Sequence, residues 1–280
     1  MLGNRGGRSF ELNAEQRSRH LHVLGASGTG KSKFLESMIR QDILAGRGLC
    51  LIDPHGTLAD DLVAFCASRN IEKYRRVHII EPGASEWTIG FNPLRLRGSE
   101  DPKLRVDTMV DACAEVWGGE SMDETPLLAT CLQLVFYALA VQRLTLVEAI
   151  QLTRSSDPEG FRKLLTERLP DYVYQSYWDD FRSLPRREFE ERFSSTRRRL
   201  LRFLGSAVVR RILGQQAHVL DARQIMDEGD ILIVNLAQRE GFSKTSGRLL
   251  GALPRQRVLS YGAWPRPGRC KAKSVLSVYR

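Results

Sequence analysis

The sequence lacks the cysteine patterns that metal-binding and disulfide-rich proteins use. Its five cysteines include no C-x-x-C pair, and Cys50, Cys113 and Cys131 lie in apolar runs, where a thiol behaves as a small hydrophobe. We therefore expect no zinc site, and reduced thiols in a cytosolic protein. The N-terminus carries Arg5 and Arg8 without a following apolar segment, so we expect no secretory signal peptide.

Long hydrophobic runs are scarce as well. The longest, residues 127–141, is shorter than a bilayer-spanning helix requires and includes Thr130 and Gln133. A buried helix explains this run better than a membrane span. We therefore expect a cytoplasmic protein with no direct membrane span, which would reach a membrane only by docking on a partner.

Acidic residues are outnumbered by basic ones, 33 to 42, which gives a net charge of +9 at pH 7. A positive surplus favours an acidic partner such as DNA or an anionic membrane surface, but it does not select between them. The alternative is a soluble protein that is basic without such a partner. The 280 residues suffice for one large α/β domain or for one domain with a sizeable insertion.

The strongest motif is the octapeptide GASGTGKS, which fits the phosphate-binding P-loop pattern G-x-x-x-x-G-K-[ST]. An apolar run before it predicts a core strand over residues 20–24, and a helical pattern follows over residues 33–44. Glycines allow successive backbone N–H groups to curl around an anion, and the helix N-terminus adds partial positive charge. We predict that the loop binds ATP through Gly25, Ala26, Ser27, Gly28, Thr29, Gly30, Lys31 and Ser32.

Two side chains of this loop have predicted roles of their own. Lys31 is long enough to reach the β- and γ-phosphates and is the predicted catalytic residue. The Ser32 hydroxyl is the predicted Mg²⁺ ligand, while Ser27 and Thr29 contribute backbone N–H groups. The predicted cofactors are therefore ATP and Mg²⁺.

Alternating strands and helices follow the loop. Residues 49–52 are continuously apolar and end at Asp53, which is typical of a buried parallel strand. A helix is predicted over residues 58–68 with Thr57 as its N-cap, and a further strand over residues 77–80. This order predicts an α/β fold with a parallel sheet and right-handed crossovers.

A different pattern occupies residues 103–213, where no convincing strand occurs. Helices are predicted over residues 104–117, 127–142, 146–153, 158–169, 172–184 and 188–204. Strand character returns at residues 218–220 and, more strongly, at residues 231–236. The sequence therefore predicts an all-α insertion within the α/β domain.

A P-loop ATPase normally pairs its loop with an apolar strand that ends in Asp-Glu. No apolar strand of this sequence ends in that pair, since the candidates end at Asp53, Glu81 and Asn235. Asp53 is included among the predicted cofactor-binding residues as a candidate Mg²⁺-side carboxylate. Fixing the turn is its alternative role, because Asp-Pro is a good turn former.

Four motifs in order resemble the FtsK/HerA-like ATPases, and within them the coupling proteins of conjugative transfer and type IV secretion. They are the P-loop, LIDPHG at 51–56, GFNPL at 90–94 and GDILIVNL at 229–236. The resemblance runs from Phe10 to Gly251. It implies a RecA-like motor that assembles into a ring, usually a hexamer, binds ATP between subunits and moves DNA. It also implies membrane-bound secretion machinery as a partner, at the periphery of the inner membrane.

With this resemblance, we predict an N-terminal arm (1–19), a RecA-like nucleotide-binding domain in two parts (20–100 and 215–253), an all-α insertion (101–214) and a disordered basic tail (254–280). In the family, the strand after the Asn-Leu segment carries the Asp-Glu pair. Here a Pro/Arg-rich tail follows instead, as in a truncated or frameshifted chain. We therefore expect nucleotide binding with impaired hydrolysis.

Two alternatives remain open for function. One is a P-loop kinase for a small molecule or nucleotide that uses Asp53 as a base or metal ligand, and the other is a non-enzymatic remnant that binds nucleotide. Residues 197–199 are three arginines that fit an arginine finger, a DNA phosphate contact or a solvated helix face. Aromatic residues among the arginines of 172–193 fit a helical core better than a base-stacking platform.

Overall fold

The computed structural model describes residues 3–5, 8–10, 16, 21–82, 90–96, 98–117, 126–157, 159–216, 220–237, 246–252 and 276–277. The chain divides into two compact units. The sheet unit comprises Met1–Glu81, Asp221–Ala237 and Tyr261–Arg280, and the helical unit comprises Pro82–Leu220 and Gln238–Ser260.

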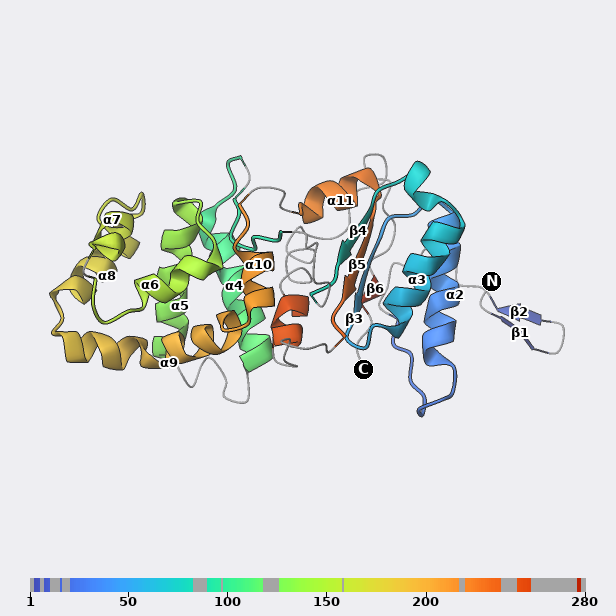
Figure 1. The fold of residues 1–280 in the computed structure, drawn as a ribbon, viewed down its shortest axis with the longest axis horizontal. Helices are drawn as coiled ribbons and strands as arrows, with labels where there is room; N and C mark the ends of the chain where they lie inside the picture. The colour runs from blue at the N-terminus through green and yellow to red at the C-terminus, as the bar shows by residue number, and fades with distance from the viewer. Residues whose placement is uncertain are drawn as a thin grey trace. The chain divides into compact units, whose positions relative to one another are not determined.

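A parallel sheet forms the centre of the sheet unit (Figure 1), in the order β4, β5, β3, β6. Its strands are β4 (Val77–Ile80), β5 (Ile231–Asn235), β3 (Leu49–Asp53) and β6 (Leu276–Ser277). All three pairings are parallel, and Asp53 lies opposite Asn235 in the register. The carboxyl ends of β3 and β5 are therefore level, at one edge of the sheet. The predicted α/β fold with a parallel sheet is confirmed.

Two helices, α2 (Lys31–Leu44) and α3 (Thr57–Ser68), pack beside each other and against the sheet (Figure 1). Their apolar residues recur at helical spacing, so each helix turns one face inward. The buried core joins Ile39 and Ile43 of α2 to Leu62 of α3 and to Leu51 and Ile233 of the strands. Full burial of each such side chain contributes roughly 1.5–3 kcal/mol.

The segment before the P-loop differs from the predicted core strand. Residues 21–24 have no regular secondary structure, and the side chains of Leu21 and Leu24 are 49% and 80% exposed. The prediction of a strand there was wrong. An apolar run becomes a strand only where a neighbouring strand supplies the ladder of hydrogen bonds, and no strand pairs with 21–24 among the described residues.

Shorter elements complete the sheet unit. They are the antiparallel pair β1 (Gly3–Arg5) and β2 (Arg8–Phe10), the 3-10 helix η1 (Ile71–Lys73) and helix α11 (Ala222–Glu228). Strand β6 lies in the segment predicted to be a disordered tail, and that prediction does not hold at these two residues. The remainder of residues 254–280 lies outside the described part of the chain.

Each of the six predicted helical segments contains a helix in the structure. The elements are α4 (Pro102–Trp117), α5 (Pro126–Val141), η2 (Leu146–Glu148), α6 (Ala149–Leu152), α7 (Phe161–Thr166), α8 (Tyr172–Ser183) and α9 (Arg186–Leu204), followed by α10 (Ala207–Leu213). Another helix covers residues 246–252. The predicted strand at 218–220 is not seen, because Leu220 lies outside any strand and 218–219 lie outside the described residues.

Residues 82–100 and 246–252 group with the helices, although the predicted boundaries assigned them to the sheet domain. Backbone hydrogen bonds explain the grouping of the first segment. Phe91 N–H donates to Ile212 at 2.8 Å, and Gly90 accepts from Leu220 N–H at 3.0 Å. The Asn92 amide donates to the Leu144 carbonyl at 3.0 Å. The GFNPL motif is thus held by the loop after α5 and by α10.

The aromatic residues of α8 and α9 form a core, as their spacing favoured. Trp178 stacks on Phe193 with ring centroids 5.8 Å apart, and Phe189 stacks on Phe193 at 4.6 Å. These rings and Phe181 are buried, whereas Tyr172 is 82% exposed. Large rings at helical spacing on two packed helices bury their apolar area against each other, whereas a base-stacking platform would leave its rings exposed.

None of the described helices has the length and hydrophobicity required to cross a bilayer.

We predict that the buried cysteines resist alkylation in the folded chain. Burial raises the pKa of the Cys50 thiol to about 12 and that of Cys131 to about 11, and it also raises the pKa of Cys113. At about pH 8 these thiols stay protonated and shielded, and the thiolate is the reactive form. Mass spectrometry after iodoacetamide treatment should find all three unmodified without urea and modified with it. Modification of Cys50 in the folded chain would contradict its placement in β3.

Candidate nucleotide-binding site

The P-loop has the backbone geometry that its glycines predict. Gly28 and Gly30 have φ values of 80° and 85°, in the left-handed region that other residues rarely adopt. Gly25 is required for a different reason, since a Cβ there would lie 2.7 Å from Thr29 Oγ1. The Thr29 hydroxyl donates to the Ala26 carbonyl at 2.8 Å and tightens the loop. The chain thus forms a compact turn directly before α2.

The first turn of α2 is suited to an anion. Gly30 is the N-cap and offers no side-chain cap, and the first turn contains no acidic residue. Lys31 folds back over the loop, where its Nζ donates to the carbonyls of Gly25 and Ala26 at 2.7 and 2.6 Å. Ser32 follows as the second, half-buried residue of the helix. A helix N-terminus with its ammonium group at the loop is a phosphate-binding arrangement, so these residues fit a nucleotide.

One ion pair relates this helix to the next. Lys33 Nζ lies 2.8 Å from Asp61 Oδ2 near the start of α3, and also 2.8 Å from Glu36. The hydrogen bond to Asp61 is the main reason that the pKa of Lys33 is raised. The N-terminal turns of α2 and α3 are therefore neighbours. Because α3 follows directly from β3, the P-loop lies at the carboxyl end of that strand.

Asp53 uses both carboxylate oxygens to hold the turn after β3. Its Oδ1 accepts from the backbone N–H of His55 at 2.9 Å, and its Oδ2 accepts from Leu58 and Ala59 at 2.9 and 3.0 Å. The side chain is 4% exposed. Asp53 thereby caps α3, and the predicted N-cap Thr57 is instead the first residue of the helix. These contacts favour the turn-fixing role over direct metal binding.

The turn after β3 also packs tightly against the end of β5. A Cβ on Gly56 would lie 2.7 Å from Asn235 Oδ1 and from the Ala237 Cβ, and Gly56 has a φ of 86°. The Asn235 side chain donates to Asp60 at 3.1 Å and accepts from Ala237 N–H at 3.1 Å. Asn235 is thus a bridge between β5 and α3. No sequence pattern indicates this contact, apart from the position of Asn235 at a strand end.

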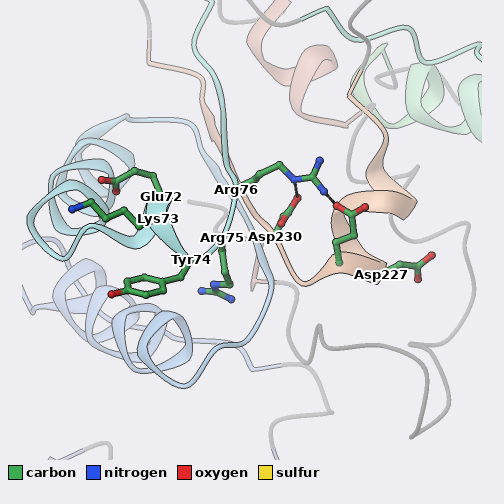
Figure 2. Close-up of a pocket in the computed structure, with 8 residues that line it drawn as sticks. Glu72, Lys73, Tyr74, Arg75, Arg76, Asp227 and Asp230 are labelled. Carbon is green, nitrogen blue, oxygen red and sulfur yellow. Dashed lines mark ion pairs between the residues drawn. The ribbon is translucent and has the colours of Figure 1, made fainter.

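A second cluster of charged residues, which the sequence did not predict, occupies the opposite edge of the sheet (Figure 2). An open pocket there is lined by Glu72, Lys73, Tyr74, Arg75, Arg76, Asp227, Glu228 and Asp230. Arg75 donates to the carbonyls of Arg47 at 2.7 Å, Gly229 at 3.1 Å and Ile43 at 3.1 Å. Arg76 forms ion pairs with Glu228 and Asp230. These contacts fasten the start of β5 to the end of α2.

The remaining candidate residues lie elsewhere. Glu81, after β4, is half-buried. Residues 197–199 lie on α9 in the helical unit. All three interpretations of these arginines, as a finger, a DNA phosphate contact or a solvated helix face, stay predictions.

Comparison with known proteins agrees with this site. Residues 4–105 match the family model of the helicase HerA central domain. This HerA segment includes the P-loop, the turn after β3 and strand β4, so the resemblance to the FtsK/HerA-like ATPases is confirmed. No curated protein sequence is significantly similar to the chain.

Solved structures extend the likeness beyond the HerA segment. The plasmid coupling protein TrwB, in complex with the non-hydrolysable GTP analogue GDPNP, matches with a TM-score of 0.58 and 20% identity, over 90% of this chain and 55% of that one. The unbound bacterial conjugative coupling protein TrwBdeltaN70 matches with a TM-score of 0.54 and 20% identity, over 85% of this chain and 50% of that one. The RecA-like P-loop fold is therefore shared. The chain spans about half the length of these structures.

Proposed function

We propose that this chain is the ATP-binding motor domain of a DNA-translocating ATPase of the conjugative coupling type. The observation that carries the proposal is the P-loop at the start of α2, with Lys31 folded over the loop. The HerA segment and the TrwB-like fold support a motor ATPase over other P-loop proteins. A GTP analogue is bound in one TrwB structure, which supports a nucleotide as the ligand.

The residues of the loop have different proposed roles in nucleotide binding. We propose that backbone N–H groups around Gly28 and Gly30 surround the phosphates, while Lys31 leaves the loop carbonyls to contact the β- and γ-phosphates. The Ser32 hydroxyl would hold Mg²⁺, which neutralises phosphate charge when bound. Asp53 would act through the turn that it fixes, because its oxygens already accept three backbone N–H groups.

We predict that this chain binds ATP but turns it over slowly or not at all. Water activation needs an acidic side chain beside the γ-phosphate. The sequence has no apolar strand that ends in Asp-Glu, and the Asp53 carboxylate is already engaged by three backbone N–H groups. Release of radiolabelled phosphate should therefore match that of a Lys31→Ala variant, while ATP binding by the unmodified chain is retained. Turnover clearly above the Lys31→Ala level, with Asp53 intact, would overturn the prediction.

The same proposal includes self-association into a ring, DNA as the substrate and docking on membrane-bound secretion machinery. Size-exclusion chromatography with and without ATP separates a ring-forming motor from a monomeric kinase. A kinase would in addition transfer phosphate to an acceptor without any effect of DNA. A non-enzymatic remnant would bind nucleotide and show neither assembly nor dependence on DNA.

A further inference from the structure

The second half of α9 and the helix after it are basic without interruption. Between Arg192 and Leu220 the sequence contains no aspartate or glutamate. It does contain seven arginines: Arg192, Arg197, Arg198, Arg199, Arg202, Arg210 and Arg211. The first half of α9 is different, because Arg187 is paired there with Glu191 in the same helix. The first half of α9 therefore carries charges of both signs, and the second half carries only positive charge.

Two of these arginines, Arg198 and Arg202, lie in the C-terminal half of α9, and Arg210 reaches the end of α9 from α10. Arg198 and Arg202 are exposed and four residues apart, so they share one helix face. Arg210 is exposed too, and its Nη1 donates to the carbonyls of Leu204 and Gly205 at 2.6 and 2.7 Å. Among the described residues, no ion pair is formed by Arg198 or Arg202. We call Arg198, Arg202 and Arg210 the α9 basic surface.

Helix stability accounts for only part of this charge. Cations near a helix C-terminus complement the helix dipole, and Arg210 already contacts the terminal carbonyls. Like charges four residues apart repel each other, so Arg198 beside Arg202 weakens an isolated helix. An anionic partner that contacts both guanidinium groups removes this repulsion. Arginine forks match phosphate oxygens better than any other side chain does.

We propose that the α9 basic surface binds the phosphate backbone of DNA. The proposal rests on the proposed function, since it assigns a DNA contact to the motor and places it in the helical unit. Phosphate contacts are independent of sequence, which suits a protein that moves along its substrate. The surface would therefore position the DNA strand without reading its bases.

The test is fluorescence anisotropy of labelled single-stranded and duplex DNA with the full chain, between about 50 and 200 mM salt. The Arg198→Gln/Arg202→Gln double variant should bind DNA about tenfold or more weakly at the lower salt concentration. The slope of log affinity against log salt should fall by roughly 1.4–1.8, which is the loss of two phosphate contacts. Circular dichroism should show an unchanged helix content.

Two control variants test whether the position of the positive charge, and not only its amount, determines DNA binding. Arg186→Gln/Arg187→Gln removes the same charge from the other end of α9, and Arg266→Gln/Arg269→Gln removes it from the C-terminal segment. Both should leave the salt slope nearly unchanged. An unchanged slope in the Arg198/Arg202 variant, or loss confined to either control, overturns the assignment. If the Arg198/Arg202 variant loses binding to anionic vesicles but still binds DNA as the unmodified chain does, the assignment is overturned as well.

Failure of the proposed function would look different. If the unmodified chain binds neither single-stranded nor duplex DNA at low salt, both the α9 basic surface and the DNA motor are contradicted. If it binds DNA and the Arg198/Arg202 variant binds equally well, only the α9 basic surface is contradicted. ATP binding, measured in the same samples, should be the same in every arginine variant.

Discussion

Replacement of Lys31 by alanine should weaken ATP binding by roughly 10- to 100-fold, since charge-assisted hydrogen bonds contribute about 1.5–3 kcal/mol each. The Lys31 ammonium lies 2.7 and 2.6 Å from the carbonyls of Gly25 and Ala26, at the loop that would surround the phosphates. Titration with a fluorescent ATP analogue measures the change. Folding should be unaffected, because the loop is exposed and its carbonyls become available to water.

Lys33→Ala provides the matched control for this result. Lys33 lies on the same helix two residues later, but its ammonium contacts Asp61 and Glu36 instead of the loop. Removal of a positive charge from this turn should therefore change ATP affinity much less than removal of Lys31. Equal losses in the two variants would mean that general charge, not the P-loop geometry, governs binding.

Replacement of Asp53 by alanine should lower the free energy of unfolding by roughly 3–5 kcal/mol, since each buried N–H left without a partner costs about 1–3 kcal/mol. Asp53 is 4% exposed and serves three backbone N–H groups. Loss of the cap also frees the first turn of α3, which packs on the sheet core. Urea denaturation followed by circular dichroism measures the loss, in the transition that belongs to the sheet unit.

Asp53→Asn distinguishes the two roles that the sequence left open for this residue. Asparagine retains one oxygen acceptor, so the turn should survive with a smaller loss of stability. ATP binding in the presence of Mg²⁺ should then stay close to that of the unmodified chain. A stable Asp53→Asn chain that loses Mg²⁺-dependent ATP binding would instead favour a metal-side carboxylate. Asp61→Ala, on the surface of the same helix, should shift the urea midpoint far less.

The sequence was sufficient for the elements whose physics is local. The P-loop pattern predicted the turn and the helix after it, because Gly28 and Gly30 adopt the left-handed backbone that only glycine tolerates easily. The apolar runs at 49–52, 77–80 and 231–236 predicted strands β3, β4 and β5. Helical periodicity likewise located every predicted helix of residues 104–204. In each of these cases, neighbouring residues in the sequence decide the outcome.

Only the tertiary structure decided what depends on partners distant in the sequence. The run at 21–24 has a strand-like composition and is no strand, because no described strand pairs with it. The role of Asn235 depends on Asp60, which lies 175 residues earlier in the chain. Arg75 gave no sequence signal, since its three acceptors belong to separate segments. The P-loop can thus be predicted from the sequence, whereas the contacts around it depend on how distant segments pack together.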